Sequence, residues 1–222
     1  MNGFGISFPD PRQAPDDGPL AVGGDLSVQT LGRAYAAGIF PWYDASSPIL
    51  WWCPNPRFVL RPNEVHISHS LEKTLKESTW KVTFDQNFSA VIRACARTSR
   101  PGQKGTWITP EMMQAYEKFH EEGYAHSVEV WDGEALVGGL YGVAIGHAFF
   151  GESMFHRIPD ASKVGFVHLV KQLCKWNFKL IDCQQKTAHL ARFGAKEWPR
   201  NQFLDELAEA VSLARPFGKW NS

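Results

Sequence analysis

Apolar residues recur at helical spacing in several segments of the chain. Phe88, Val91, Ile92 and Cys95 share one face of a helix that this spacing predicts over 88–97. Capping residues and glycine stops mark the ends of other predicted helices, such as Ser27 before one and Gly123 after another. These further helices are expected over 27–37, 70–77, 109–122, 160–176, 187–193 and 202–215.

Alternating apolar and polar positions predict strands between these helices. Residues 126–131 alternate, and Asp132-Gly133 after them is a strong hairpin signal. Residues 136–150 continue as one or two strands, with glycines at 138, 139, 142 and 146 that allow bulges. Shorter strands are expected at 80–84 and 179–184. This order of elements favours an α+β fold with a largely antiparallel sheet flanked by helices.

Aromatic and proline residues crowd the stretch from 41 to 54, where Trp42, Trp51 and Trp52 lie among three prolines. Aromatic rings held by prolines make a rigid surface, which suits packing between domains or stacking on a flat ligand. Residues 1–25 are rich in Gly, Pro and Asp and are read mostly as loop. We expect a small N-terminal domain over 1–56 and a larger domain over 57–222.

Composition is that of an ordinary globular protein, with 44% hydrophobic and 21% charged residues among 222. A formal net charge of zero excludes a generally basic coat for nucleic acid. The charge is uneven, however, because 57–104 carries a net +5 and 105–160 a net −7. The basic segment could meet phosphates and the acidic one a cationic partner, or both could be solvated helix faces.

The cysteine pattern and the N-terminus predict a cytoplasmic protein. None of the four cysteines forms a C-x-x-C pair, which favours reduced thiols. The first ten residues lack the basic and apolar regions of a signal peptide, and no apolar run has the length of a membrane span.

Three polar residues stand out against apolar surroundings. Asp182 and Gln184 lie two apart on a predicted strand, so both side chains are expected on the same face. They mark either a site or a strand end that meets solvent. Glu152 lies among aromatic residues and must be paired, either by binding an amine or an arginine or in a structural ion pair.

Other motifs carry less weight. His66 and His69 are three apart, but no ligand set with suitable spacing completes a metal site, so no metal is expected. Ser153 lacks the second glycine of a nucleophile elbow. Acyl-CoA N-acetyltransferases share this order of elements, but 159–165 (PDASKVG) does not fit their glycine-rich pyrophosphate turn. No nucleotide-binding fingerprint is present, and no cofactor is expected.

Seven collinear motifs together resemble the bacterial leucyl/phenylalanyl-tRNA–protein transferases. They are LAVGGDLS (20–27), GIFPW (38–42), PILWW (48–52), GTWI (105–108), AHSVE (125–129), GESMF (151–155) and LIDCQ (180–184). The resemblance extends from about residue 19 to residue 204. Departures from the family pattern include Cys53, Leu140, His156, Thr187 and Arg192.

The resemblance implies an aminoacyltransferase with a small N-terminal domain and an acetyltransferase-like domain that uses no acyl-CoA. An aminoacyl-tRNA would donate Leu, Phe or Met to the α-amino group of a protein that begins with Lys or Arg. The tagged protein would enter an N-terminal degradation pathway. The expected partners are therefore aminoacyl-tRNA and acceptor proteins, with no membrane, and the enzyme is expected to be a monomer.

The resemblance also assigns roles by position. Asp182 and Gln184 match the family's central catalytic pair, and Glu152 matches a neighbouring carboxylate. Aromatic residues near the terminal adenosine of the tRNA correspond to Trp42, Trp107 and Tyr116. The pocket for the donor side chain corresponds to Leu140, Phe149, Met154, Phe166, Leu169 and Ile181. Residues alone would also allow these six to be ordinary core.

The chemistry of aminoacyl transfer suggests that Asp182 and Gln184 act by positioning the reacting groups. An ester is already activated, and an α-amino group with a pKa of roughly 8 is partly neutral near pH 7. We expect Asp182 to orient Gln184 and to stabilise the positive charge that develops on the attacking nitrogen. Lys73 and Lys76 are candidates for phosphate contacts with the acceptor stem. The rival interpretations are an acetyl-CoA-dependent N-acetyltransferase and a non-catalytic module that binds nucleic acid.

Overall fold

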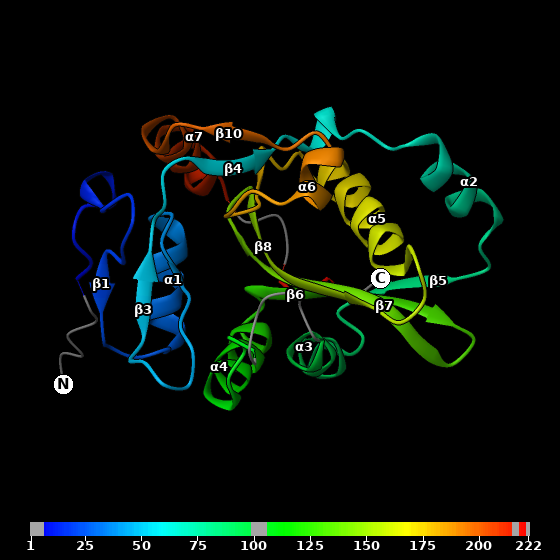
Figure 1. Ribbon diagram of the computed structural model, residues 1–222, viewed down its shortest axis with the longest axis horizontal. Coiled ribbons are helices and arrows are strands. Elements are labelled where there is room, and N and C mark those ends of the chain that lie inside the picture. The colour runs from blue at the N-terminus through cyan, green and yellow to red at the C-terminus, as the bar shows by residue number, and fades with distance from the viewer. Residues whose placement is uncertain (1–6, 99–105, 215–217, 221–222) are drawn as a thin grey trace.

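A seven-stranded sheet forms the centre of the molecule in the computed structural model, which describes residues 7–98, 106–214 and 218–220 (Figure 1). The strand order is β10-β4-β9-β8-β7-β6-β5, and all neighbours are antiparallel except β8 and β9. The strands are β4 (Arg57–Leu60), β5 (Lys81–Phe84), β6 (Ala125–Asp132), β7 (Ala135–Ile145), β8 (Ala148–His156), β9 (Leu180–Asp182) and β10 (Lys196–Trp198).

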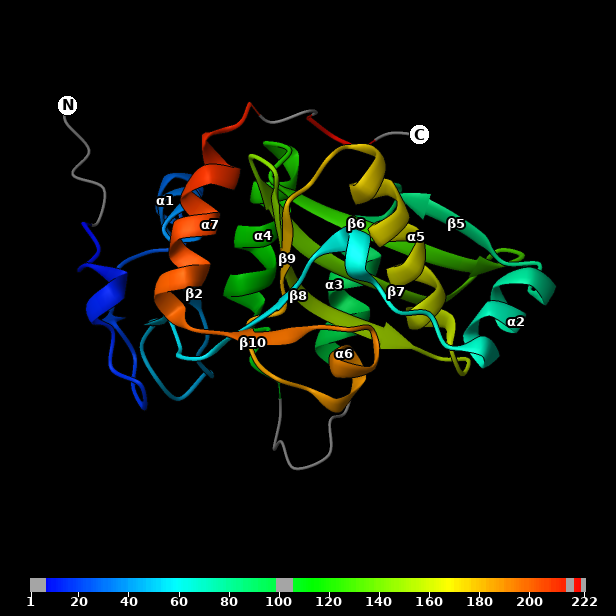
Figure 2. The same cartoon turned by 90° about the horizontal axis from the view of Figure 1, so that it is seen from above.

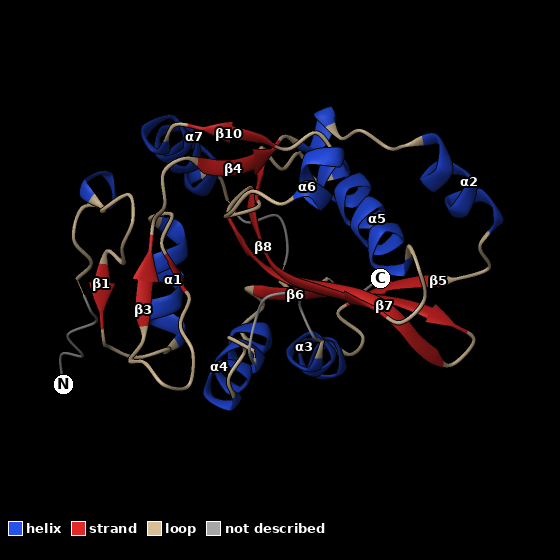
Figure 3. Cartoon of the chain, viewed as in Figure 1, coloured by secondary structure: helices blue, strands red, loops and turns tan. Residues whose placement is uncertain are grey.

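Helices cover both faces of this sheet (Figure 3). One face packs on α3 (Phe88–Arg97) and α4 (Pro110–Glu121), and the other on α5 (Ala161–Lys175). The helix α2 (His69–Glu77) packs against α5, and the short α6 (Ala188–Arg192) follows β9 along the chain. This arrangement confirms the α+β class with a largely antiparallel sheet flanked by helices.

The N-terminal part has its own three-stranded sheet, ordered β1-β3-β2. Its strands are β1 (Ala21–Val22), β2 (Phe40–Pro41) and β3 (Leu50–Trp52), and α1 (Val28–Ala36) lies between β1 and β2 in sequence. Short 3₁₀ turns occur at Pro11–Gln13 and Pro62–Glu64. The last helix, α7 (Arg200–Ser212), returns to pack against α1 (Figure 2).

Helix ends follow the capping residues that the sequence shows. The side chains of Ser27 and Thr109 accept hydrogen bonds from the backbone N–H groups of Thr30 and Met112, so each satisfies an otherwise unpaired donor. The helix predicted over 88–97 is α3, and its four predicted apolar residues are all buried. Predicted and observed helices agree within a few residues for all seven.

Several strands were not predicted. Residues 39–54, which include the aromatic stretch, form β2 and β3, and 57–60 and 196–198 form β4 and β10. The strand expected over 179–184 is shorter, because β9 ends at Asp182 and Gln184 has a left-handed backbone with φ of 60°. No helix among the described residues is long and apolar enough to cross a membrane.

The two larger apolar cores lie on opposite faces of the large sheet, and a small third cluster consists of Val130, Val137 and Ala161. One joins α1, α3, α4 and α7 to the small sheet, so apolar contacts run continuously from the first 56 residues into the rest of the chain. The other lies beneath α5 and includes Trp220 near the C-terminus. None of the four cysteines forms a disulfide bond. The division into domains at residue 56 stays a prediction.

Candidate active site

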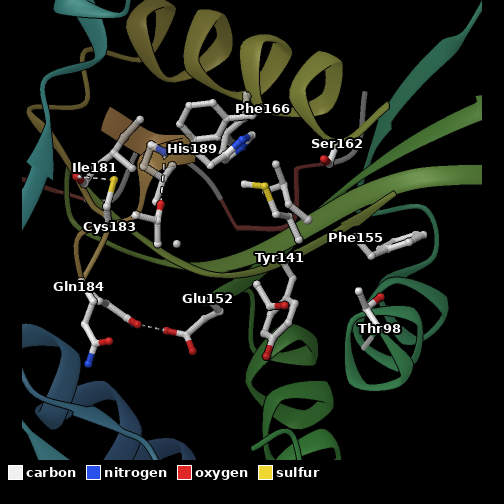
Figure 4. A pocket seen from close by; sticks show the side chains of 18 of the residues that line it. Thr98, Tyr141, Glu152, Phe155, Ser162, Phe166, Ile181, Cys183, Gln184 and His189 are labelled. Atoms are coloured by element: carbon white, nitrogen blue, oxygen red, sulfur yellow. Dashed lines mark hydrogen bonds between the residues drawn. The ribbon is translucent and has the colours of Figure 1, made fainter. Parts of the chain in front are cut away.

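A cavity of about 670 Å³ opens between β8, the end of β9, α5 and α6 (Figure 4). Its walls are largely apolar on one side and polar on the other. In Figure 4, Phe166 and Ile181 lie on the apolar side, and Glu152 and Gln184 face each other on the polar side. The cavity therefore combines space for an apolar group with polar atoms beside it.

All six residues predicted for the donor side-chain pocket line this cavity. They come from β7, β8, α5 and β9 and are Leu140, Phe149, Met154, Phe166, Leu169 and Ile181. Five of them are buried, and Met154 is partly buried. Residues that lie far apart in sequence are thus brought together around one apolar space.

Glu152 is held by three donors at the polar edge. Gln184 Nε2 donates to Glu152 Oε1 at 2.8 Å, and the Tyr35 hydroxyl donates to the same oxygen at 2.7 Å. The Tyr116 hydroxyl lies 3.3 Å from Oε2 and within hydrogen-bonding distance of the Tyr35 hydroxyl. Because Tyr35 uses its one proton on Glu152, Tyr116 donates its own proton either to Oε2 or to the Tyr35 oxygen. Glu152 and Gln184 therefore form a fixed unit whose carboxylate borders the cavity.

A β-bulge places Glu152 in this position. Tyr141 of β7 pairs with Ser153 of β8, and the next residue, Gly142, pairs with Gly151. Glu152 is the extra residue of the bulge, which is a common device for turning a side chain toward a site. A Cβ atom on Gly142 would lie 2.3 Å from the Phe150 carbonyl oxygen and 2.4 Å from the Phe149 ring. Glycine at 142 therefore permits the close approach of β8 at the bulge.

Burial raises the pKa of Glu152 to about 7. Hydrogen bonds from Tyr35, Gln184 and Tyr116 favour the ionised form but only partly offset this effect. A carboxyl group with this pKa changes its protonation state near neutral pH. It can therefore either accept a proton or stabilise a cation in the cavity.

Asp182 is oriented differently from the sequence expectation. Its carboxylate is fully buried and accepts hydrogen bonds from Arg57 Nε at 2.8 Å and Arg57 Nη2 at 2.6 Å. The expectation that Asp182 and Gln184 share one strand face is wrong, since β9 ends between them. They are linked instead through the Gln184 backbone N–H, which donates to Asp182 Oδ1 at 2.8 Å.

Arg57 was not identified from the sequence, although it organises the site. It lies at the start of β4, which pairs with β9, and its guanidinium also lies over the rings of Phe40 and Phe203. The net +5 of 57–104 therefore overstates the charge available to a ligand, because Arg57 is internal. Arg100 and Lys104 lie outside the described residues.

The aromatic residues predicted near an adenosine divide into two groups. Trp42 and Trp107 line the cavity, and the indole of Trp52 donates to the Trp42 carbonyl oxygen at 2.7 Å. Tyr116 is buried, is not part of the cavity lining, and acts on Glu152 instead. The sequence also missed Tyr35, which nothing distinguishes from the other apolar-face residues of α1.

Among the described residues, the remaining polar candidates make no hydrogen bond to the Glu152 carboxylate. Lys73 and Lys76 are exposed on α2 and do not line the cavity, and Lys73 Nζ lies 3.9 Å from Glu77 Oε1. His189 lines the cavity, and its pKa is lowered mainly by burial, so it is neutral at pH 7. The Thr187 hydroxyl caps α6 by accepting from Leu190 N at 3.2 Å. Within the described ranges, no group of three or more His, Cys, Asp or Glu could hold a metal.

Family models and sequence relatives of this chain carry the name of one family. Residues 59–208 match the family model "Leucyl/phenylalanyl-tRNA protein transferase", and 24–55 match the model of the N-terminal domain of the same family. A leucyl/phenylalanyl-tRNA–protein transferase from Anaeromyxobacter sp. (strain Fw109-5) is 57% identical over 97% of this chain and 92% of its own. A relative of the same name from Anaeromyxobacter dehalogenans (strain 2CP-C) is 56% identical, over 96% and 92% of the two chains.

A weaker match among solved structures is a GCN5-related N-acetyltransferase from Kribbella flavida. It is 9% identical, with a TM-score of 0.39 over 73% of this chain and 58% of that chain.

Proposed function

Because the chain belongs to the leucyl/phenylalanyl-tRNA–protein transferase family, we propose that it transfers leucine or phenylalanine from an aminoacyl-tRNA to the α-amino group of an acceptor protein. The reaction is aminoacyl transfer: the amine nitrogen attacks the ester carbonyl carbon. The C–O bond to the tRNA ribose then breaks, the nitrogen loses a proton, and the ribose oxygen gains one. The finer proposal is that acceptors begin with Lys or Arg, that Met is also a donor, and that the product is marked for degradation.

The observation that carries this proposal is the contact between an apolar cavity and the Glu152–Gln184 pair. A leucine or phenylalanine side chain fits the chemistry of the six apolar lining residues. The ester carbonyl carbon of the donor aminoacyl-tRNA would then lie at the polar edge of the cavity, where Gln184 and Glu152 are held. Donors would be distinguished by size and polarity, with roughly 1–3 kcal/mol per methylene.

Gln184 is proposed to align the acceptor amine. Its Nε2 faces the Glu152 carboxylate, which accepts hydrogen bonds when ionised, so the amide oxygen remains to accept one from an attacking N–H group. An amide is a very poor base, but alignment alone can provide a large part of the acceleration. The left-handed backbone at Gln184 is fixed by the bond from its N–H to Asp182.

Glu152 replaces Asp182 as the proposed charge-stabilising group. The Asp182 carboxylate is neutralised by Arg57 and has no exposure to the cavity, so we assign it to positioning Gln184. Glu152 borders the cavity and has a pKa of about 7. It is therefore suited to stabilise the cationic nitrogen formed during attack, or to receive the proton that this nitrogen loses.

The tRNA is proposed to bind around the same cavity. Trp42 and Trp107 are available to contact the terminal adenosine, whereas Tyr116 would act only through Glu152. Exposed Lys73 and Lys76 on α2 are proposed to contact phosphates of the acceptor stem. Such contacts predict a strong dependence of binding on salt concentration, weakened by alanine at both positions.

One assay tests the proposed function against its rivals. The chain is supplied with labelled Leu-tRNA and a peptide that begins with Arg, without any acyl-CoA, and we expect labelled peptide. Gln184→Ala should slow transfer strongly, whereas Gln202→Ala, an exposed glutamine on α7, should not. Binding of tRNA without transfer would favour a non-catalytic module, and acetylation from acetyl-CoA would favour an N-acetyltransferase.

A further inference from the structure

A second cavity of about 490 Å³ adjoins the first. Thr98, Phe155 and His156 belong to the lining of both. In Figure 4, Thr98 and Phe155 lie on the side of the first cavity away from Gln184. The two cavities therefore adjoin along these three residues, on the side where a ligand with its reacting end at Gln184 would continue.

Arginine side chains dominate the charge of the second cavity. Arg93, Arg97 and Arg157 line it, with Glu134 as the one lining carboxylate among the described residues. Arg93 is already paired, because its Nη2 lies 3.3 Å from Glu117 Oε1. Across the described ranges, by contrast, no ion pair forms at Arg97 or Arg157. These two guanidinium groups are therefore available to an anion.

The backbone near both arginines is fixed. Arg97 is the last residue of α3, and the Thr98 hydroxyl after it donates to the Ala94 carbonyl oxygen at 2.8 Å. Arg157 follows β8, its backbone N–H donates to the Val137 carbonyl oxygen at 2.7 Å, and its guanidinium lies 6.0 Å from the Phe155 ring centre. Two cations from different elements thus line the second cavity, each next in sequence to a residue that lines both cavities.

We propose that this second cavity binds a phosphodiester group of the single-stranded 3′ end of the donor RNA, with Arg97 and Arg157 as its ligands. The inference rests on the proposed function, which places the terminal nucleoside in the first cavity. A terminal nucleoside bears its phosphate on the 5′ side, so the chain must leave the cavity through an opening. The second cavity adjoins the first and carries matching charge, and arginine binds phosphate oxygens through two parallel hydrogen bonds.

Other cations near the first cavity fit this role less well. Lys163 lines the first cavity, but its Nζ lies 2.6 Å from Asp160 Oδ1. Lys73 and Lys76 line neither cavity. They are compatible with phosphates further along the RNA, so the two sets of contacts would add to each other.

Binding of unreactive donor analogues tests the inference. In the first analogue, phenylalanine is joined by an amide bond to aminoadenosine, which carries no phosphate. In the second, the same phenylalanyl nucleoside is the last residue of a CCA trinucleotide. The affinity of each analogue for the protein is measured by calorimetry. Arg97→Gln and Arg157→Gln should each weaken trinucleotide binding by about tenfold, as expected for a charge-assisted hydrogen bond. The slope of log affinity against log salt should decrease by about 0.7 per lost contact. Binding of the phosphate-free analogue should not change.

The control is Arg33→Gln, which removes an exposed arginine on α1 that lines neither cavity. Arg97→Lys and Arg157→Lys should recover part of the affinity. The inference is overturned if the double variant Arg97→Gln/Arg157→Gln binds the trinucleotide as tightly as the parent, or if its affinity for both analogues falls equally. These outcomes differ from failure of the proposed function, in which the parent binds neither analogue and transfers no amino acid.

Discussion

The guanidinium of Arg57 and the carboxylate of Asp182 form a two-point ion pair at 2.8 and 2.6 Å, with neither side chain exposed. The same carboxylate accepts the backbone N–H of Gln184. A charge that is buried and paired in this way fixes the turn after β9 and contributes little field to the cavity. The site therefore separates into a positioning pair and the Glu152–Gln184 unit that borders the cavity.

Removing one member of the buried pair should destabilise the fold. Arg57→Met leaves the Asp182 carboxylate buried without its partner, so we expect a loss of about 3–5 kcal/mol in the free energy of unfolding. Urea unfolding followed by fluorescence measures the change. Arg61→Gln is the control, because its partly exposed pair with Glu206 should contribute less than about 1 kcal/mol. Equal effects of the two variants would contradict the role given to Arg57.

Glu152→Gln should change the pH dependence of both stability and transfer. The folded pKa is about 7, above the ordinary value of roughly 4.3 in an unfolded chain. Between these values the folded chain holds a proton that the unfolded chain has released, so stability falls as pH rises from about 4.3 to 7. The variant lacks this titration, so its stability relative to the parent should increase across the same window.

Transfer by the parent should rise with pH through an apparent pKa near 7, because ionised Glu152 is the form that stabilises a cation. Glu152→Gln should lower kcat by about 10²-fold or more and lose this inflection, within the range for acid–base groups. Rates at saturating donor and peptide between pH 5.5 and 9 measure the effect. Glu197→Gln, at an exposed carboxylate, should keep the parent profile. An unchanged inflection in Glu152→Gln would assign the titration to another group.

Gly142→Ala should disturb the bulge that presents Glu152. The added Cβ would overlap the Phe150 carbonyl oxygen and the Phe149 ring, so strands or side chains must move. Overpacking of this kind costs about 1–3 kcal/mol, and we expect transfer to fall because Glu152 and Phe149 both shift. Gly32→Ala is the matched control, since its Cβ meets nothing within 4 Å and alanine favours a helix. Gly32→Ala should leave the rate of aminoacyl transfer unchanged and should stabilise the folded protein slightly.

Trp220→Ala should weaken binding of the donor side chain. Trp220 stacks on His126 with ring centroids 3.8 Å apart, and its backbone N–H donates to Asp85 Oδ2 at 2.7 Å. Its ring also lies 5.8 Å from that of Phe149, whose ring lines the first cavity. We expect a loss of about 3–5 kcal/mol in stability. KM for Phe-tRNA should rise more than kcat falls, measured below the unfolding transition.

Leu213→Ala, at an exposed leucine, is the control for that change and should have little effect on either quantity. If Trp220→Ala destabilised the chain but left KM for Phe-tRNA unchanged, Trp220 would support the fold alone.

Local signals predicted the helices but not the assembly of the site. Ser27 and Thr109 cap helices with their own side chains, so a few neighbouring residues determine where those helices begin. In contrast, β4 has four consecutive buried residues and no alternation to identify it as a strand. The pairing of Arg57 with Asp182 depends on contacts across 125 residues, which no local pattern contains.

The apolar lining residues were recognisable only through collinear motifs. Phe149 and Ile181 look like core residues by spacing, and both are indeed buried. Tyr35 gave no signal, because a tyrosine on the buried face of a helix resembles any other packed aromatic. Its role follows from the hydroxyl contact with Glu152, which lies 117 residues further along the chain.

The position of β4 next to β9 also has a consequence for synthesis of the protein. Arg57 leaves the ribosome early, but Asp182 follows 125 residues later, which is roughly ten seconds at typical translation rates. Throughout that interval the strand that will hold Arg57 lacks both the carboxylate and the neighbouring strand. The centre of the large sheet therefore closes near the end of translation, and prematurely terminated chains cannot assemble a working transferase.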